Sequence, residues 1–174
     1  MNKKITIIFK KKNKTKIVCL TAYSKNISKI LDNYCDIILV GDSMANVLYG
    51  ENNTHKIHLK NIIQHSISVK KGINKSLLVV DMPKNSYNNL NQAEKNAKLI
   101  IKKTKCDAVK LESNNKNFKI ISDLVKKRIP VMGHIGYTPQ FKKKFKVEGD
   151  TKLKAIKLLK EALLIEKAGA FSIV

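Results

Sequence analysis

Two opposite charges, Lys110 and Glu112, interrupt an apolar segment of this sequence at "VKLE". Alternate side chains of a β-strand share a face, so these two point the same way while their apolar neighbours point the other way. Burying two charges on one face of an interior strand is costly unless they are paired or bind something. The segment is therefore a candidate binding or catalytic site.

Polar residues also occur near the ends of three other apolar segments: Asp42, Ser43, Asp81 and His134. Carboxylates that converge repel one another unless a positive charge lies between them. Mg²⁺ binds one or two carboxylates, keeps several waters and leaves positions for substrate oxygens. The pattern predicts a magnesium site built from Asp42, Asp81 and Glu112, beside which Lys110 supplies a positive charge for an anionic substrate.

Each of these residues also has a purely structural interpretation. Asp42 could cap a helix or form a turn, and Asp81 could begin a turn before the following proline. Lys110 and Glu112 could be a buried ion pair, and His134 could be a hydrogen-bonded core histidine. Four consecutive segments ending in such residues favour a functional site over structure alone.

The elements that must position these residues alternate along the chain. Short segments rich in Val and Ile are predicted as buried strands: 16–22, 36–43, 76–83, 107–113, 129–136 and 169–174. Between them, apolar residues at spacings of three and four predict helices within 24–34, 59–72, 90–101, 118–125 and 151–167. This alternation is typical of a parallel α/β fold, either a doubly wound sheet or a (β/α)8 barrel.

The glycine motifs of nucleotide-binding doubly wound folds, GxGxxG and GxxxxGK[ST], do not occur in the sequence, which favours the barrel. In both folds active sites lie at the carboxyl ends of the strands. A complete barrel has eight strands, whereas this sequence ends within the sixth. We therefore expect residues 1–174 to form a single, incomplete barrel domain.

The formal charge of +22 raises the possibility of nucleic-acid binding. Lysines are spread over nearly every segment, however, and only one arginine and few aromatic residues occur, so neither nucleic acid nor a membrane is an expected partner. The cysteines form no CxxC pair, and no apolar run reaches the length of a membrane span. A reduced, cytoplasmic setting is expected.

The segments "ILVGDS", "LLVVDMP", "DAVKLE", "IPVMGHIGYTPQ" and "EKAGAFSIV", in this order, resemble the ketopantoate hydroxymethyltransferase family. The resemblance implies a (β/α)8 TIM barrel of the phosphoenolpyruvate/pyruvate-binding type and a cytoplasmic homo-oligomer, often a decamer. It implies transfer of a hydroxymethyl group from 5,10-methylenetetrahydrofolate to 3-methyl-2-oxobutanoate, giving 2-dehydropantoate, with Mg²⁺ acting as a Lewis acid. Related Mg²⁺-dependent 2-oxoacid lyases or mutases are the alternative.

Carried over by residue, the resemblance places metal ligands at Asp42, Asp81 and Glu112. It places substrate contacts at Asp42, Ser43, Asp81 and Lys110, and His134 could line the site. The glutamate that serves as the base in the family would follow the last strand, beyond Val174. The 174-residue chain is therefore expected not to exchange the C3 proton of the substrate by itself.

The sequence also departs from the family's usual pattern where the family has glycines. Met44, Ala45 and Asn46 follow "GDS", Lys84 and Asn85 replace a Phe-Gly after "DMP", and Ser113 and Asn114 follow "VKLE". Glycine often permits close backbone approach or a positive φ angle. These replacements are expected to loosen or reshape the folate side of the site.

Overall fold

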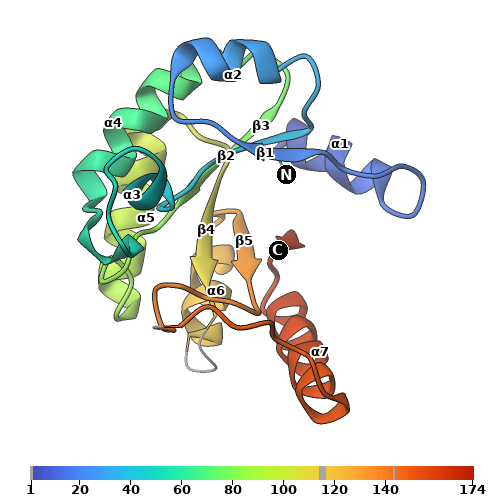
Figure 1. The fold of residues 1–174 in the computed structure, drawn as a ribbon. Helices are drawn as coiled ribbons and strands as arrows, with labels where there is room; N and C mark the ends of the chain where they lie inside the picture. Colours follow the sequence, from blue (N-terminus) through green and yellow to red (C-terminus); the bar gives the residue numbers. More distant parts are fainter. Residues whose placement is uncertain (1, 114–116, 143) are drawn as a thin grey trace.

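The computed structural model of the chain describes residues 2–113, 117–142 and 144–174. Within these residues, six parallel strands form one sheet in which each strand pairs with the next along the chain (Figure 1). The strands are β1 (Cys19–Thr21), β2 (Ile37–Val40), β3 (Leu77–Asp81), β4 (Ala108–Glu112), β5 (Val131–His134) and β6 (Ser172–Ile173). All six predicted strands are confirmed, although each is shorter than its apolar segment.

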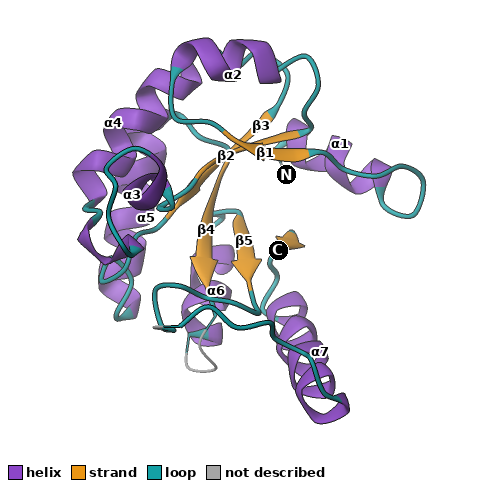
Figure 2. Cartoon of the chain, viewed as in Figure 1, coloured by secondary structure: helices purple, strands orange, loops and turns teal. Residues whose placement is uncertain are grey.

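The helices alternate with the strands (Figure 2). They are α1 (Lys3–Lys11), α2 (Lys25–Leu31), α3 (Met44–Val47), the 3₁₀ turn η1 (Thr54–Lys56), α4 (Leu59–Lys70), α5 (Leu90–Thr104), α6 (Phe118–Lys126) and α7 (Lys152–Lys167). A doubly wound sheet reverses its strand order, whereas strands that pair strictly in sequence are the pattern of a barrel. The structure therefore has the predicted barrel architecture, with six strands in its described part.

Two apolar clusters hold the sheet in place. The larger lies between the sheet and the outer helices and includes Ile38 and Ile62. The smaller lies on the inner face of the sheet, where Ile5 and Ile8 of α1 pack with Leu77 and other strand residues. Helix α1 thus closes the inner face, a role that its lysine-rich sequence did not predict.

Helix α7 packs closely on β5 through Gly133. A Cβ atom at this glycine would lie 2.5 Å from Cγ2 of Ile165, a buried residue of α7. The apolar side predicted for this helix remains largely exposed, since Leu153 is 82% and Leu159 is 62% accessible. The helix therefore contacts the sheet through a narrow line of residues.

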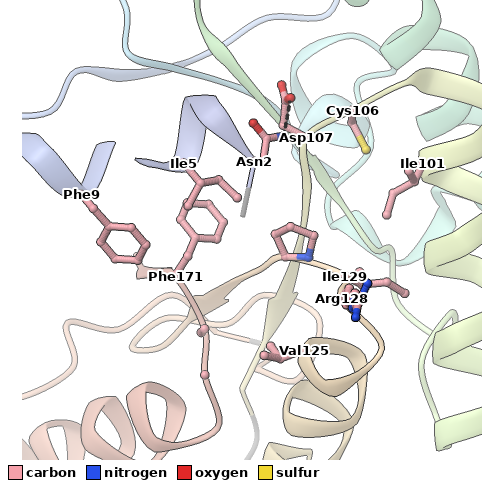
Figure 3. Close-up of a pocket in the computed structure, with 13 residues that line it drawn as sticks. Asn2, Ile5, Phe9, Ile101, Cys106, Asp107, Val125, Arg128, Ile129 and Phe171 are labelled. Carbon is pink, nitrogen blue, oxygen red and sulfur yellow. Dashed lines mark hydrogen bonds between the residues drawn. The ribbon is translucent and has the colours of Figure 1, made fainter. Parts of the chain in front are cut away.

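A cavity of about 660 Å³ lies at the amino ends of β4, β5 and β6. Figure 3 shows Ile5 and Phe9 of α1 beside Phe171, and Asn2 bonded to Asp107. Because residues at this end of a barrel usually serve stability, this cavity is not the candidate active site. No helix among the described residues is long and apolar enough to cross a membrane.

Candidate active site

The charged residues singled out in the sequence lie at the carboxyl ends of neighbouring strands. Asp81 ends β3 and Glu112 ends β4, while Asp42 follows β2 by two residues. The strand register places Lys110 directly beside Asp81 and Glu112 directly beside His134. We call Asp42, Asp81, Lys110 and Glu112 the strand-end cluster; all four residues are buried.

Asp81 is the centre of this cluster. Its Oδ1 accepts a hydrogen bond of 2.6 Å from Nζ of Lys110, and the two side chains form a buried ion pair. Its Oδ2 accepts a bond of 3.0 Å from the backbone N–H of Asp42. These bonds join the ends of β2, β3 and β4 through one carboxylate.

Gln140, in the segment that follows β5, also joins the cluster. Its Nε2 donates to Oδ2 of Asp42 at 2.8 Å and to the carbonyl of Met82 at 3.0 Å. Its backbone N–H donates to Oε2 of Glu112 at 2.9 Å, and its Oε1 accepts a bond of 2.5 Å from the hydroxyl of Tyr87. Sequence reasoning missed both Gln140 and Tyr87 as site residues.

The pKa values of the cluster reflect its excess of negative charge. Burial, together with the charges of Asp81 and Glu112, raises the pKa of Asp42 to about 7. Burial alone would lower the pKa of Lys110, but Asp81, Asp42 and Glu112 together raise it. Lys110 therefore stays protonated, while Asp42 is poised to gain or lose a proton near neutral pH.

His134 stands next to Glu112 at the end of β5. Its Nδ1 lies 3.6 Å from Oε1 of Glu112, and the two form an ion pair only when the imidazole is protonated. In the part of the chain that is described, this buried nitrogen makes no hydrogen bond. His134 therefore lies beside the cluster, and its role in lining the substrate site stays a prediction.

Ser43 lies at the exposed edge of the cluster, where its Oγ is 2.7 Å from the hydroxyl of Tyr23. Gly41 allows this arrangement, because a Cβ there would meet Oγ of Ser43 at 3.0 Å and Oδ2 of Asp81 at 3.4 Å. A cavity of about 610 Å³ begins at Ser43 and is lined by polar residues that include His55 and Lys142. The cluster can therefore be approached from this side.

The donor chemistry and charge of the cluster suit a hard divalent cation. Asp42, Asp81 and Glu112 supply carboxylate oxygens, and Lys110 offsets only one of their three charges. Within the described ranges, however, no three His, Cys, Asp or Glu side chains are grouped closely enough to hold one metal ion together. Two carboxylates with a third acting through water fit this arrangement better than three direct ligands.

The residues that replace the family's usual glycines have different surroundings. Met44 and Ala45 are fully buried in α3, whereas Asn85 has a φ of 65°. Asparagine tolerates this left-handed conformation better than most residues, so Asn85 keeps the backbone shape that a glycine would allow. Ser113 is buried, and Asn114 lies outside the described residues.

Comparison with known sequences identifies the family. The ketopantoate hydroxymethyltransferase family matches residues 3–174. The 3-methyl-2-oxobutanoate hydroxymethyltransferase of Pelagibacter ubique is 54% identical over 174 residues, which cover 100% of this chain and 68% of that protein. The enzyme of the same name from Clostridioides difficile is 47% identical over 165 residues, covering 91% of this chain and 60% of its own length.

The solved structures that resemble the chain show its fold. Phosphonopyruvate hydrolase, in a complex with oxalate and Mg²⁺, superposes with a TM-score of 0.72 at 9% identity over 99% of this chain and 62% of that chain. A 2,3-dimethylmalate lyase of the PEP mutase/isocitrate lyase superfamily superposes with a TM-score of 0.68 at 11% identity, over 98% of this chain and 60% of that chain. These likenesses confirm the predicted barrel fold.

These two relatives are longer than this chain, which spans 68% of the Pelagibacter ubique protein and 60% of the Clostridioides difficile protein. Their identity, 54% and 47% in the two cases above, is far higher than that of the lyase and hydrolase structures. Because the family match also extends over nearly the whole sequence, the chain belongs to the ketopantoate hydroxymethyltransferase family.

Proposed function

We propose that this chain provides the oxoacid- and Mg²⁺-binding part of a 3-methyl-2-oxobutanoate hydroxymethyltransferase. The reaction would transfer a hydroxymethyl group from 5,10-methylenetetrahydrofolate to 3-methyl-2-oxobutanoate, giving 2-dehydropantoate. The observation that carries the proposal is the strand-end cluster, which gathers three carboxylates and one ammonium where barrel enzymes have their active sites. The names of the relatives supply the substrate.

The residues of the chain have separate tasks in this proposal. Asp42 and Asp81 would hold Mg²⁺ directly, and Glu112 would act directly or through a water molecule, since Mg²⁺ retains water readily. When bound, Mg²⁺ supplies a Lewis acid for the 2-oxo group. Ser43, at the exposed edge of the cluster, would contact the oxoacid together with Asp42 and Asp81.

Lys110 would stabilise charge during the reaction. Removal of the C3 proton of the oxoacid places negative charge on the 2-oxo oxygen, and a fixed ammonium nearby lowers the energy of that state. The ion pair with Asp81 keeps Lys110 protonated and oriented toward the carboxylates. The family's homo-oligomeric state and a cytoplasmic location are parts of the same proposal.

Binding of the oxoacid tests the proposal directly. The 174-residue chain is titrated by calorimetry with 3-methyl-2-oxobutanoate in MgCl₂, and then with 3-methylbutanoate, which lacks the 2-oxo group. We expect binding of the oxoacid only, its loss in EDTA, and its loss in the Asp81→Asn variant. Asp150→Asn, which changes an exposed aspartate in the same way, should bind normally. Equal binding of both acids would contradict the proposal.

A further inference from the structure

We propose that Gln140 is a positioning residue that holds the carboxylates of Asp42 and Glu112 in the orientation that Mg²⁺ and the oxoacid require. The inference rests on the proposed function, because it concerns the same site. It assigns a role to a residue that would not itself touch the metal.

Gln140 contacts two carboxylates that belong to different strands. Its side-chain Nε2 donates to Asp42, after β2, and its backbone N–H donates to Glu112, at the end of β4. Asp81, on β3 between them, is held by Lys110 instead. Gln140 and Lys110 together therefore give all three carboxylates of the cluster a fixed donor.

The direction of the Gln140 amide is determined by its other partners. The hydroxyl of Tyr87 donates to Oε1, and the carbonyl of Met82 accepts from Nε2. A reversed amide would place an oxygen against two acceptors, Asp42 and Met82, and would lose both bonds. Gln140 is only 2% exposed and Tyr87 4%, so water does not compete readily for these groups.

A neutral amide suits this position better than a charged side chain. A lysine would neutralise a further carboxylate and compete electrostatically with Mg²⁺, whereas a glutamate would add another negative charge beside Asp42. Glutamine donates to Asp42 and leaves the net charge of the cluster unchanged. Groups that hydrogen-bond to metal ligands in this way typically contribute about 10–100-fold to metal affinity.

The test compares the affinity of the 174-residue chain for MgCl₂, measured by calorimetry, with that of its variants. Gln140→Met keeps the approximate volume and the backbone N–H but removes the amide, and we expect its Mg²⁺ affinity to fall by about 10–100-fold. Tyr87→Phe keeps Gln140 but removes the group that orients it, and we expect a smaller loss. Gln64→Met makes the same change at an exposed position of α4 and should bind as the unchanged chain does.

Two further measurements separate positioning from folding. The urea midpoint of each variant reports stability, and the electron paramagnetic resonance spectrum of bound Mn²⁺ reports the geometry of its ligands. A positioning role predicts an altered Mn²⁺ spectrum in Tyr87→Phe under conditions where its urea midpoint shows that the variant is fully folded. In a chain that already carries Tyr87→Phe, Gln140→Met should lower Mg²⁺ affinity less than it does in the unchanged chain, because the two residues act as a unit.

The outcomes distinguish this inference from the proposed function. If the unchanged chain binds Mg²⁺ and the oxoacid and both variants bind Mg²⁺ equally well, the inference is wrong while the proposed function stands. If the unchanged chain binds neither Mg²⁺ nor the oxoacid, both are wrong.

Discussion

Replacement of Asp42 by asparagine should make the chain more stable at mildly alkaline pH while it weakens Mg²⁺ binding. Asp42 is buried among Asp81, Glu112 and Lys110, and its pKa is raised to about 7. Asparagine has nearly the same shape, and its side-chain oxygen can still accept the hydrogen bond from Gln140. The change therefore removes a costly buried charge with little loss of packing.

The magnitude follows from the pKa shift of Asp42, from 3.8 to about 7, which corresponds to about 4 kcal/mol at about 1.4 kcal/mol per unit. Because the folded chain binds this proton more tightly than the unfolded chain, the stabilisation from protonated Asp42 is complete below about pH 4. It is lost as the pH rises through about 7. Asp42→Asn should therefore be more stable by about 4 kcal/mol at about pH 8, and nearly equal in stability below about pH 4.

Urea unfolding of both proteins in EDTA, from about pH 4 to pH 8, measures this difference. Asp150→Asn is the control, because Asp150 is exposed and pairs with Lys154 on the surface, where ion pairs contribute little. An Asp42→Asn variant that is no more stable than the original chain at the alkaline end would refute the reasoning. Parallel pH profiles of the two proteins would refute it as well.

Three further predictions concern the cluster and the sheet. Lys110→Met should lower the free energy of unfolding by about 3–5 kcal/mol near neutral pH, because it leaves the buried Asp81 without its cation; urea denaturation measures this. Gly133→Ala should cost about 1–3 kcal/mol in the same assay, since the added methyl group overlaps Ile165. The 174-residue chain should not exchange the C3 proton of 3-methyl-2-oxobutanoate with D₂O at an enzymatic rate, because the proposed function engages Asp42, Asp81 and Glu112 with Mg²⁺ and leaves none of them as the base; proton NMR follows this.

Each of these predictions has a contradicting result. Unchanged stability of Lys110→Met would mean that Asp81 finds another partner or becomes protonated at little cost. Unchanged stability of Gly133→Ala would mean that α7 shifts freely on the sheet. Rapid exchange in D₂O would show that a residue of this chain acts as the base.

The strands could be predicted because continuous apolar segments rich in Val and Ile require burial on both faces. The predicted helix regions are also confirmed, because apolar residues that recur at helical spacing are a reliable sign of a helix. Periodicity identifies the apolar side of a helix but not what covers it. Ile27 and Ile30 of α2 and Leu153 of α7 belong to such sides and are exposed.

The sequence pattern did not predict helix α1, because only two of its residues are buried and they make a weak apolar pattern. Ile5 and Ile8 are buried, whereas the lysines around them give the segment a polar composition. Its position follows from distant partners, such as Ser76, whose carbonyl accepts a bond from Lys4. Contacts of this kind are not visible in local sequence patterns.

The charged residues of the candidate site could be found from their places at strand ends, because parallel strands bring these ends together. Gln140 and Tyr87 could not be found in this way, since 53 positions separate them and neither ends a strand. The proline and glutamine of "GYTPQ" belong to a motif that indicates the family, and the motif alone assigns no role to Gln140. The partners of a buried amide are determined by the folded structure.

The strict pairing of each strand with the next along the chain bears on how this protein folds during synthesis. Each new strand emerging from the ribosome finds its partner already in place, so each pairing needs only the strand synthesised just before it. Helix α1 is the exception, because Asn2 bonds to Asp107, 105 positions away. Helix α1 also pairs with Asp36 and Ser76, which precede β2 and β3, so its contacts are complete only once β4 has formed, and until then part of the apolar inner face of the growing sheet stays uncovered and prone to aggregation.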